Sequence, residues 1–321
     1  MSDTFLGSCD AHGPMQTDAA LQAPLFLTGF ARSGTTWINR LLRDYFDTGL
    51  VNEGQFIVSF GLRLTRYGDL DQKAHRERLL RDLRADPFFS IVRRNYGVEI
   101  DWQQVASAQP SFRAITLDIL GQIAAQTHKQ RIGSKYPVFG RHLDLLNRLF
   151  PDCRVVHVVR DGRDCALSHK GVTWGYQNTY SAAVHWQQYI EAARRSSAAM
   201  PGRYVEIRYE DLLLHPEQSM RALEHFITGD DSFPVTQRFV QNGMALKTEK
   251  VEGWRADMSA ASQAIFEGVA GDVLAHCGYP LTGVAHVPSL LERTGYRIHN
   301  RVTREGWHLA RKVFKRLPER K

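Results

Sequence analysis

A glycine-rich loop between a short apolar run and a helical pattern constrains this sequence more than any other feature. The loop spans residues 29–37 and follows the apolar run over residues 25–30. Gly29 and Gly34 have the Gly-x4-Gly spacing of a Walker A loop. These glycines allow a tight turn in which backbone N–H groups surround an anion at the start of a helix. The segment therefore predicts a buried strand, an anion-binding loop and a helix in succession.

The same loop lacks the lysine of a Walker loop. Thr35 follows Gly34, where that lysine would serve the β- and γ-phosphates of a nucleoside triphosphate. The positive charge lies inside the loop instead, at Arg32. The loop is therefore suited to a compact anion at the 5′ end of a nucleotide, and ATP and GTP are disfavoured. On the glycine spacing alone, an ordinary turn between a strand and a helix is the alternative.

Apolar runs of strand length alternate with helical patterns along the rest of the chain. Strands are expected over residues 25–30, 131–136, 155–159 and 204–209, and helices over residues 35–45, 76–84, 112–126, 143–149, 164–170, 181–200 and 219–227. This alternation predicts an α/β fold with a central parallel sheet flanked by helices. We expect one domain over residues 24–290, a loose N-terminal tail over residues 1–23 and a basic helical extension over residues 291–321.

A second anion site is expected at the end of the strand over residues 155–159. Arg160 follows this strand directly, at the edge where open α/β sheets bind ligands. Ser168 lies eight residues further on, about two helical turns, so its hydroxyl can face the same anion. An arginine offers a bidentate fork that fits a phosphate. The alternative is a surface ion pair of Arg160 with Asp161 or Asp164.

Together these segments resemble the P-loop sulfotransferases, which use 3′-phosphoadenosine-5′-phosphosulfate (PAPS) as sulfuryl donor. The resemblance implies that the 5′-phosphosulfate is held by Arg32, Ser33, Gly34, Thr35 and Thr36. It implies that Arg160 and Ser168 bind the 3′-phosphate and that Trp37 stacks on the adenine, although Trp37 also fits core packing. Residues 204–212 resemble the third strand of the family, which places Tyr209 near the adenine.

The segment over residues 247–255 resembles the family's C-terminal loop, which closes over the 3′-phosphate. The match is partial, because Gly253 and Trp254 fit the pattern while its usual Arg-Lys-Gly start is not intact. Lys247 and Lys250 are the available cations, and the sequence does not choose between them.

The resemblance also points to the catalytic residues. One branch of the family has a histidine base two residues after a lysine, but here Pro137 stands two residues after Lys135. The Lys-x-Pro pattern resembles the branches that act on sugars and on protein tyrosines, which use a glutamate base beyond the phosphate loop. Glu53, 21 residues after Arg32, is the expected base. Lys135 and Arg32 are expected to contact the transferring sulfuryl group, and His142 is the alternative base.

The acceptor is left open by the sequence. The segment over residues 55–112 matches no pattern, and its aromatic side chains fit either a core or an acceptor site: Phe56, Phe60, Phe88, Phe89, Tyr96 and Trp102. The Lys-x-Pro pattern favours a hydroxyl of a carbohydrate or small hydroxylated metabolite over an amine. No metal is expected, because arginine and lysine can supply the charge and the thirteen histidines form no metal-binding pattern.

The net charge of +7 belongs to the C-terminal end. Residues 293–321 contain ten Lys/Arg and two Asp/Glu, a net charge of +8, which leaves the remainder at −1. A nearly neutral body gives no reason to expect a nucleic acid partner. The basic end fits an amphipathic helix on an anionic membrane, or a solvated helix docked on the body. Four scattered cysteines and an N-terminus unlike a secretory signal predict a cytoplasmic protein, with membrane contact at the inner surface at most.

Two other functions compete with sulfuryl transfer. A P-loop kinase of a small molecule would need Mg²⁺ and a lysine in the loop, and it gives Arg160 and Ser168 no role. A catalytically inactive nucleotide-binding protein would keep the loops without turnover. Transfer from PAPS to an acceptor hydroxyl uses every motif and is the predicted activity.

Overall fold

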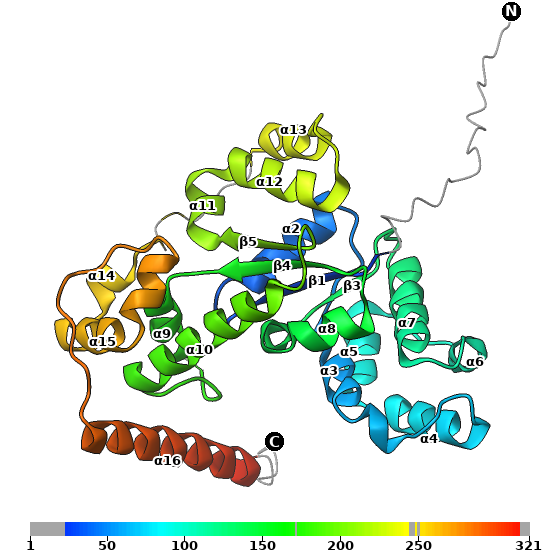
Figure 1. Ribbon diagram of the computed structural model, residues 1–321, viewed down its shortest axis with the longest axis horizontal. Helices are drawn as coiled ribbons and strands as arrows, with labels where there is room; N and C mark the ends of the chain where they lie inside the picture. Colours follow the sequence, from blue (N-terminus) through cyan, green and yellow to red (C-terminus); the bar gives the residue numbers. More distant parts are fainter. Residues whose placement is uncertain (1–22, 171, 244–247, 249–250, 315–321) are drawn as a thin grey trace, which may run out of the picture.

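The computed structural model of this chain describes residues 23–170, 172–243, 248 and 251–314. Its centre is a sheet of five parallel strands in the order β2-β3-β1-β4-β5 (Figure 1). The strands are β1 (Leu25–Gly29), β2 (Val51–Asn52), β3 (Gly133–Lys135), β4 (Arg154–Val159) and β5 (Tyr204–Arg208). The predicted α/β fold with a central parallel sheet is confirmed.

Helices connect the strands and cover the sheet. They are α2 (Thr35–Tyr45), α3 (Gln55–Gly61), α4 (Lys73–Arg84), α5 (Pro87–Tyr96), α6 (Trp102–Ser107), α7 (Phe112–Gln126), α8 (Leu143–Leu149), α9 (Gly162–Lys170), α10 (Thr179–Ser197), α11 (Tyr209–Leu214), α12 (Pro216–Thr228), α13 (Pro234–Gln241), α14 (Trp254–Asp257), α15 (Ala260–His276) and α16 (Leu290–Phe314), with short 3-10 helices η1 (Leu64–Arg66) and η2 (Pro137–Arg141). The predicted helices over residues 35–45, 112–126 and 143–149 agree with α2, α7 and α8 to the residue. Other predicted helices differ at their ends, since α9 begins two residues before the expected start and α10 ends three residues before the expected end.

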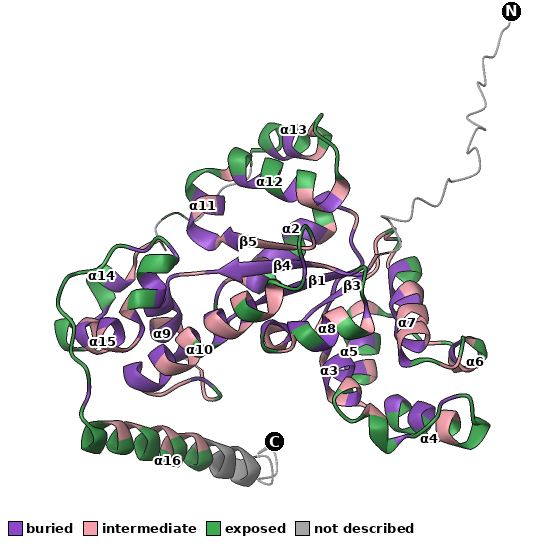
Figure 2. Ribbon diagram, viewed as in Figure 1, coloured by how far each residue is buried: buried purple, intermediate pink, exposed green. Residues whose placement is uncertain are grey.

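Apolar layers lie on both faces of the sheet. Phe26 and Val155 belong to a cluster with α3, α4, α5, α7 and α8, whereas Leu27 and Val156 belong to a cluster with α2, α11, α12 and α13. Side chains of a strand alternate between its two faces, so the central strands β1 and β4 contribute to both clusters. Figure 2 shows the sheet buried and the outer faces of the helices exposed.

All five strands run in one direction, so their carboxyl ends meet at one edge of the sheet. The glycine-rich loop follows β1, Glu53 follows β2, and Lys135 ends β3. Arg160 follows β4, and Tyr209 follows β5. The fold therefore brings five separate segments of predicted site residues to the edge where parallel sheets bind ligands.

The C-terminal helix α16 lies apart from the sheet (Figure 1). It is attached to the start of α10, where the Gln177 N–H donates to Asn300 Oδ1 at 2.9 Å and Asn178 Nδ2 donates to the Tyr296 carbonyl at 2.8 Å. The rings of Tyr180 and Tyr296 stack with centroids 5.5 Å apart. A search of the described residues finds no helix with the length and apolar character needed to cross a membrane.

Candidate active site

A cavity of about 460 Å³ opens at the carboxyl edge of the sheet. Its lining consists of Ala31, Arg32, Gly34, Thr35, Thr36, Trp37, Arg40, Glu53, Lys135, Pro137, Arg160, Ser168, Trp174 and Tyr209. Ten of the fifteen residues that the sequence predicted for the site are in this lining. The volume lies in the range of small-molecule sites, roughly 300–1,000 Å³.

The glycine-rich loop has its shape because two positions accept only glycine. A Cβ at Gly29 would lie 2.7 Å from the carbonyl oxygen of Val158, and a Cβ at Gly34 would lie 2.5 Å from the Tyr209 ring. Gly34 also has a left-handed backbone with φ of 85°. Helix α2 begins at Thr35 without a side-chain cap, so the N–H groups of its first turn point towards the cavity end of the loop. This arrangement suits an anion at the helix N-terminus.

Side-chain hydrogen bonds tie the loop to α9. Arg32 has a left-handed backbone with φ of 74°, and its Nε donates to Ser168 Oγ at 2.9 Å. His169 Nε2 lies 3.1 Å from the carbonyl oxygen of Ala31. Burial lowers the pKa of His169 to about 4, so at neutral pH the ring is uncharged and its Nε2–H donates to that carbonyl. The two predicted anion sites are thus joined directly through Arg32 and Ser168.

Of the remaining side chains of the loop segment, some are buried in the interior and others line the cavity. The Ser33 side chain is buried, with its Oγ 3.7 Å from Cys165 Sγ, so only its backbone can face a ligand. Trp37 and Tyr209 both line the cavity, with ring centroids 6.0 Å apart and planes at 80°. These two rings form an aromatic wall at the β5 side of the cavity.

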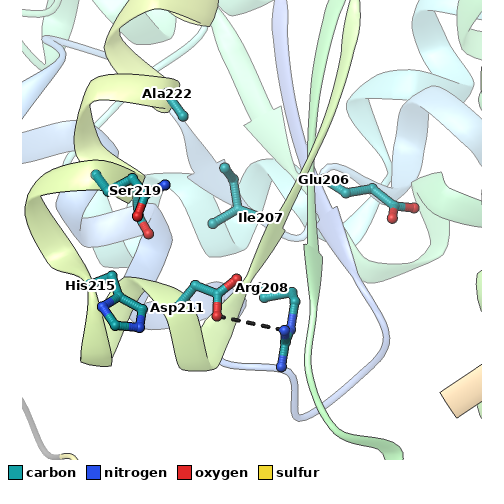
Figure 3. A pocket seen from close by; sticks show the side chains of 8 residues that line it. Glu206, Ile207, Arg208, Asp211, His215, Ser219 and Ala222 are labelled. Atoms are coloured by element: carbon teal, nitrogen blue, oxygen red, sulfur yellow. Dashed lines mark ion pairs between the residues drawn. The ribbon is translucent and has the colours of Figure 1, made fainter. Parts of the chain in front are cut away.

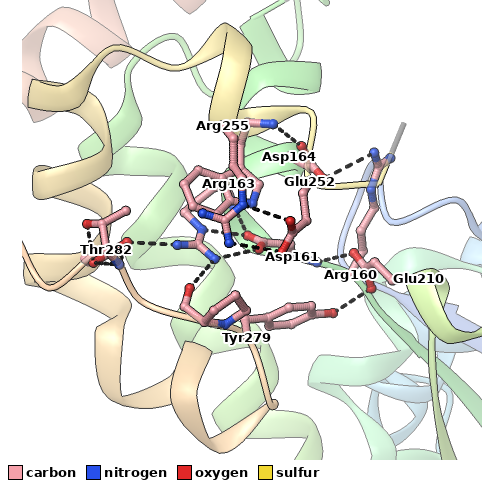
Figure 4. Close-up of polar contacts among 12 residues, drawn as sticks. Arg160, Asp161, Arg163, Asp164, Glu210, Glu252, Arg255, Tyr279 and Thr282 are labelled. Atoms are coloured by element: carbon pink, nitrogen blue, oxygen red, sulfur yellow. Dashed lines mark hydrogen bonds and ion pairs between the residues drawn. The ribbon is translucent and has the colours of Figure 1, made fainter. Parts of the chain in front are cut away.

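Arg160 occupies the second predicted anion site. Its Nη1 donates to the carbonyl oxygen of Arg32 at 3.3 Å, and its guanidinium lies 4.7 Å from the centroid of the Tyr209 ring. The alternative ion pair with Asp164 is also formed, with the two groups 3.8 Å apart (Figure 4). Burial raises the pKa of Asp164 to about 6. Arg160 keeps its place in the cavity lining although it has these protein partners.

A buried polar network fixes the turn that carries Arg160 (Figure 4). The fully buried Arg163 donates to Asp161 Oδ2 and to Glu267 Oε1, both at 2.8 Å. The Asp161 N–H donates to Glu210 Oε1 at 2.9 Å. Because breaking a buried pair leaves an uncompensated charge, this network holds the β4–α9 turn in one geometry.

The predicted loop over the 3′-phosphate is described only in part. Lys247 and Lys250 lie outside the described residues. Gly253 precedes α14, and Trp254 is 1% exposed, with its backbone N–H donating to Asp164 Oδ1 at 2.8 Å. Trp254 therefore packs in the core behind the β4–α9 turn, and neither Gly253 nor Trp254 belongs to the cavity lining.

Glu53 and Lys135 meet at the β2–β3 side of the cavity. The Glu53 N–H donates to the Lys135 carbonyl at 2.9 Å, and Lys135 Nζ donates to Glu53 Oε1 at 3.4 Å. Lys135 is 4% exposed, whereas Glu53 is 46% exposed and has a left-handed backbone with φ of 68°. Gly54 allows this turn, because a Cβ there would lie 1.9 Å from Ser134 Oγ. A carboxylate open to the cavity thus stands beside a buried ammonium group.

Four residues of the lining were not predicted from the sequence: Ala31, Arg40, Pro137 and Trp174. Arg40 lies one helical turn after Thr36 on α2, so the helical pattern contained a signal for it. Trp174 lies in the loop between α9 and α10, and nothing in the sequence marks it. The alternative base His142 precedes α8 and does not line the cavity, and burial lowers its pKa.

The aromatic residues of the unmatched segment have different positions. Three of them are buried in the core, namely Phe56, Phe60 and Phe88. Phe89 and Trp102 line a separate pocket of about 310 Å³. Tyr96 lines a cavity of about 460 Å³ that shares Thr36 and Arg40 with the lining described above.

Another pocket, of about 290 Å³, lies beside β5 and contains the ion pair of Arg208 and Asp211 at 3.7 Å (Figure 3). None of the described residues that line it was predicted for the site. Within the described ranges, no group of three or more His, Cys, Asp or Glu residues is arranged to hold a metal ion. The cationic side chains that line the active-site cavity are Arg32, Arg40, Lys135 and Arg160.

Comparisons with known proteins agree with one another. A family model described as "Sulfotransferase family" matches residues 24–230. Protein-tyrosine sulfotransferase 2 of Gallus gallus is 25% identical over 286 residues, which cover 85% of this chain and 69% of that protein. Protein-tyrosine sulfotransferase 1 of Danio rerio is 24% identical over 230 residues, which cover 67% of this chain and 58% of that protein.

Similar solved structures include the sulfotransferase domain of the Synechococcus PCC 7002 olefin synthase, with 22% identity and a TM-score of 0.45. That match covers 81% of this chain and 95% of the other. Sulfotransferase STF9 of Mycobacterium avium has 15% identity and a TM-score of 0.45, and the match covers 83% of this chain and 79% of the other.

Proposed function

This chain belongs to the sulfotransferase family, and we propose from this premise that it transfers a sulfuryl group from PAPS to an acceptor hydroxyl, with Glu53 as general base. The observation that carries the proposal is the cavity itself. At the carboxyl edge of one sheet, its lining includes two candidate anion-binding sites with arginine side chains. It also includes the ion pair of Glu53 and Lys135.

The lining supports a donor with two separate phosphate groups. The first turn of α2 and Arg32 suit the 5′ end of a nucleotide, while Arg160 and Ser168 suit a second phosphate. The aromatic wall of Trp37 and Tyr209 suits a stacked base. A nucleoside triphosphate has no group for the second anion site, whereas PAPS has its 3′-phosphate.

Glu53 and Lys135 supply the chemistry at the other end of the cavity. Glu53 takes the acceptor's hydroxyl proton while the acceptor oxygen bonds to sulfur and the bond from sulfur to the 5′-phosphate oxygen breaks. Lys135 and Arg32 stabilise the negative charge that develops on the departing phosphate. A positioned general base contributes about 10²- to 10⁴-fold to the rate.

The acceptor class is a further part of the proposal. The Lys-x-Pro pattern favours a carbohydrate or a hydroxylated metabolite, and the names of the two curated relatives add the phenol of a peptide tyrosine. We place the enzyme in the reducing cytoplasm, which is supported by three buried free cysteines among the described residues: Cys153, Cys165 and Cys277.

Two measurements test the proposal. Sulfur-labelled PAPS, mixed with panels of carbohydrates, hydroxylated metabolites and tyrosyl peptides, is expected to label at least one acceptor class without added metal. In thermal denaturation, adenosine 3′,5′-bisphosphate is expected to stabilise the protein at lower concentration than ATP, because a ligand stabilises in proportion to its affinity for the folded state. Stronger stabilisation by ATP, together with phosphate transfer from ATP, would favour the kinase alternative instead.

A further inference from the structure

Exposed apolar side chains gather near the C-terminal end of the described chain. Seven of the eleven large apolar side chains that are exposed in the described ranges lie between residues 281 and 302: Leu281, Val284, Val287, Leu290, Leu291, Ile298 and Val302. Single exposed apolar residues are ordinary, but several on one face of a helix can form a surface that contacts another molecule. We refer to these seven side chains as the 281–302 surface.

Helix α16 has two opposite faces. One face is half-buried and consists of Arg293, Tyr296, Asn300, Thr303 and Arg304. The other face has Leu291, Ile298 and Val302, which are 87%, 58% and 62% exposed. At about 100° per residue these two sets lie on opposite sides of the helix.

The contacts of the half-buried face hold the apolar face outward. Asn300 and Tyr296 accept hydrogen bonds from Gln177 and Asn178 at the start of α10. Tyr296 also stacks on Tyr180. The apolar face is therefore turned away from the body by specific contacts.

The charges around this face favour an anionic partner. Arg297 and Arg301 are exposed beside the apolar face, and Arg301 also pairs with Glu305 at 2.9 Å. The sequence over residues 293–321 has a net charge of +8 while the remainder has −1. A second copy of this chain would bring the same positive charge to the contact, whereas a bilayer with anionic lipids complements it.

We propose that the 281–302 surface binds peripherally to membranes that contain anionic lipids. The apolar face of α16 enters the boundary between headgroups and acyl chains, and the neighbouring arginines interact with lipid phosphates, as amphipathic helices with basic flanks do. This proposal does not depend on the proposed reaction.

Flotation of the full chain with lipid vesicles tests the proposal. The protein is expected to float with vesicles of phosphatidylcholine and phosphatidylglycerol, and to remain in the soluble fraction with phosphatidylcholine alone or at high salt. The double variant Ile298→Glu/Val302→Glu is expected to lose flotation. The matched control Leu214→Glu/Val240→Glu, at similarly exposed positions elsewhere, is expected to float like the wild type.

Further variants and outcomes make the test decisive. Arg297→Gln is expected to weaken binding to the anionic vesicles about fivefold, since one cation near the membrane surface is worth about 1 kcal/mol. Equal melting temperatures check that all variants are folded. Equal flotation of Ile298→Glu/Val302→Glu and wild type would overturn the proposal. So would a wild type that ignores vesicles but forms a dimer that this variant abolishes, because the surface would then be an interface between copies.

Discussion

The two ends of the active-site cavity are built differently. At the nucleotide end, Arg32 is hydrogen-bonded to Ser168, and Arg160 stands on a turn fixed by the buried Arg163 network. At the reacting end, Glu53 follows a strand of two residues, and its carboxylate has one described ion-pair partner, Lys135.

This difference suggests that one end of the cavity serves mainly nucleotide binding and the other mainly the transfer reaction. The end proposed to bind the nucleotide presents cations and N–H groups that hydrogen bonds within the protein already orient, which would lower the cost of binding an anion. The end proposed for the reaction leaves the Glu53 carboxylate 46% exposed, as the proposed role of general base requires. Substitutions at one end should therefore change affinity, and substitutions at the other should change turnover.

The largest expected effect is on turnover at the reacting end. Glu53→Gln keeps the size of the side chain but removes the proposed base, so kcat is expected to fall about 10²- to 10⁴-fold. Initial rates with labelled PAPS and a saturating acceptor measure it. Glu217→Gln, at an exposed glutamate on α12, serves as the matched control and should keep the wild-type rate. Wild-type turnover of Glu53→Gln would show that another group takes the proton.

A smaller effect is expected on stability at the nucleotide end. His169 is buried, and burial lowers its pKa to about 4 from the usual value near 6.5. Between these pH values the unfolded chain binds a proton that the folded chain does not, so stability falls as pH falls through this window. The contribution is up to about 3 kcal/mol, at 1.36 kcal/mol per pKa unit.

The variant His169→Gln isolates this contribution. Its amide can still donate to the Ala31 carbonyl but does not titrate, so its free energy of unfolding should decline less between pH 6.5 and pH 4 than that of the wild type. Urea denaturation of both proteins across this range measures the difference. Parallel pH curves would mean that His169 is not the group responsible.

The smallest effect is expected for Ser168→Ala. The substitution removes one neutral hydrogen-bonding group from the second anion site and leaves Arg160 in place, at a cost of about 1 kcal/mol. Titration with adenosine 3′,5′-bisphosphate should show binding about fivefold weaker. Unchanged affinity would mean that the Ser168 hydroxyl does not contact the nucleotide. A loss of affinity as large as that expected for Arg160→Ala would mean that the substitution had also shifted the β4–α9 turn.

The sequence predicted the fold where local patterns were strong. Helix α7 agrees to the residue because its apolar spacing coincides with an N-cap, Ser111, whose side chain accepts from the Ala114 N–H. Strand β2 has only two residues, too few for a periodic pattern, so the sequence could place Glu53 only near a strand or loop.

The candidate site was predictable to the extent that its motifs are local. The phosphate loop and the Arg160–Ser168 segment each lie within one stretch of chain, so spacing and chemistry identify them. Lys135 and Glu53 are 82 residues apart and were linked by family resemblance, not by a contact that the sequence reveals. Trp174 lines the cavity because of how the loop between α9 and α10 packs, and no local sequence pattern predicts that packing.

Binding of adenosine 3′,5′-bisphosphate to Arg160→Ala and Glu53→Gln, measured side by side by calorimetry, tests the division of the cavity most directly. Arg160→Ala removes a charge-assisted contact worth about 1.5–3 kcal/mol, so affinity should fall roughly 10- to 100-fold. Glu53→Gln should bind the nucleotide no more weakly than the wild type, because it removes a negative charge from the reacting end. Equal losses in both variants, or an unchanged affinity in Arg160→Ala, would contradict the account.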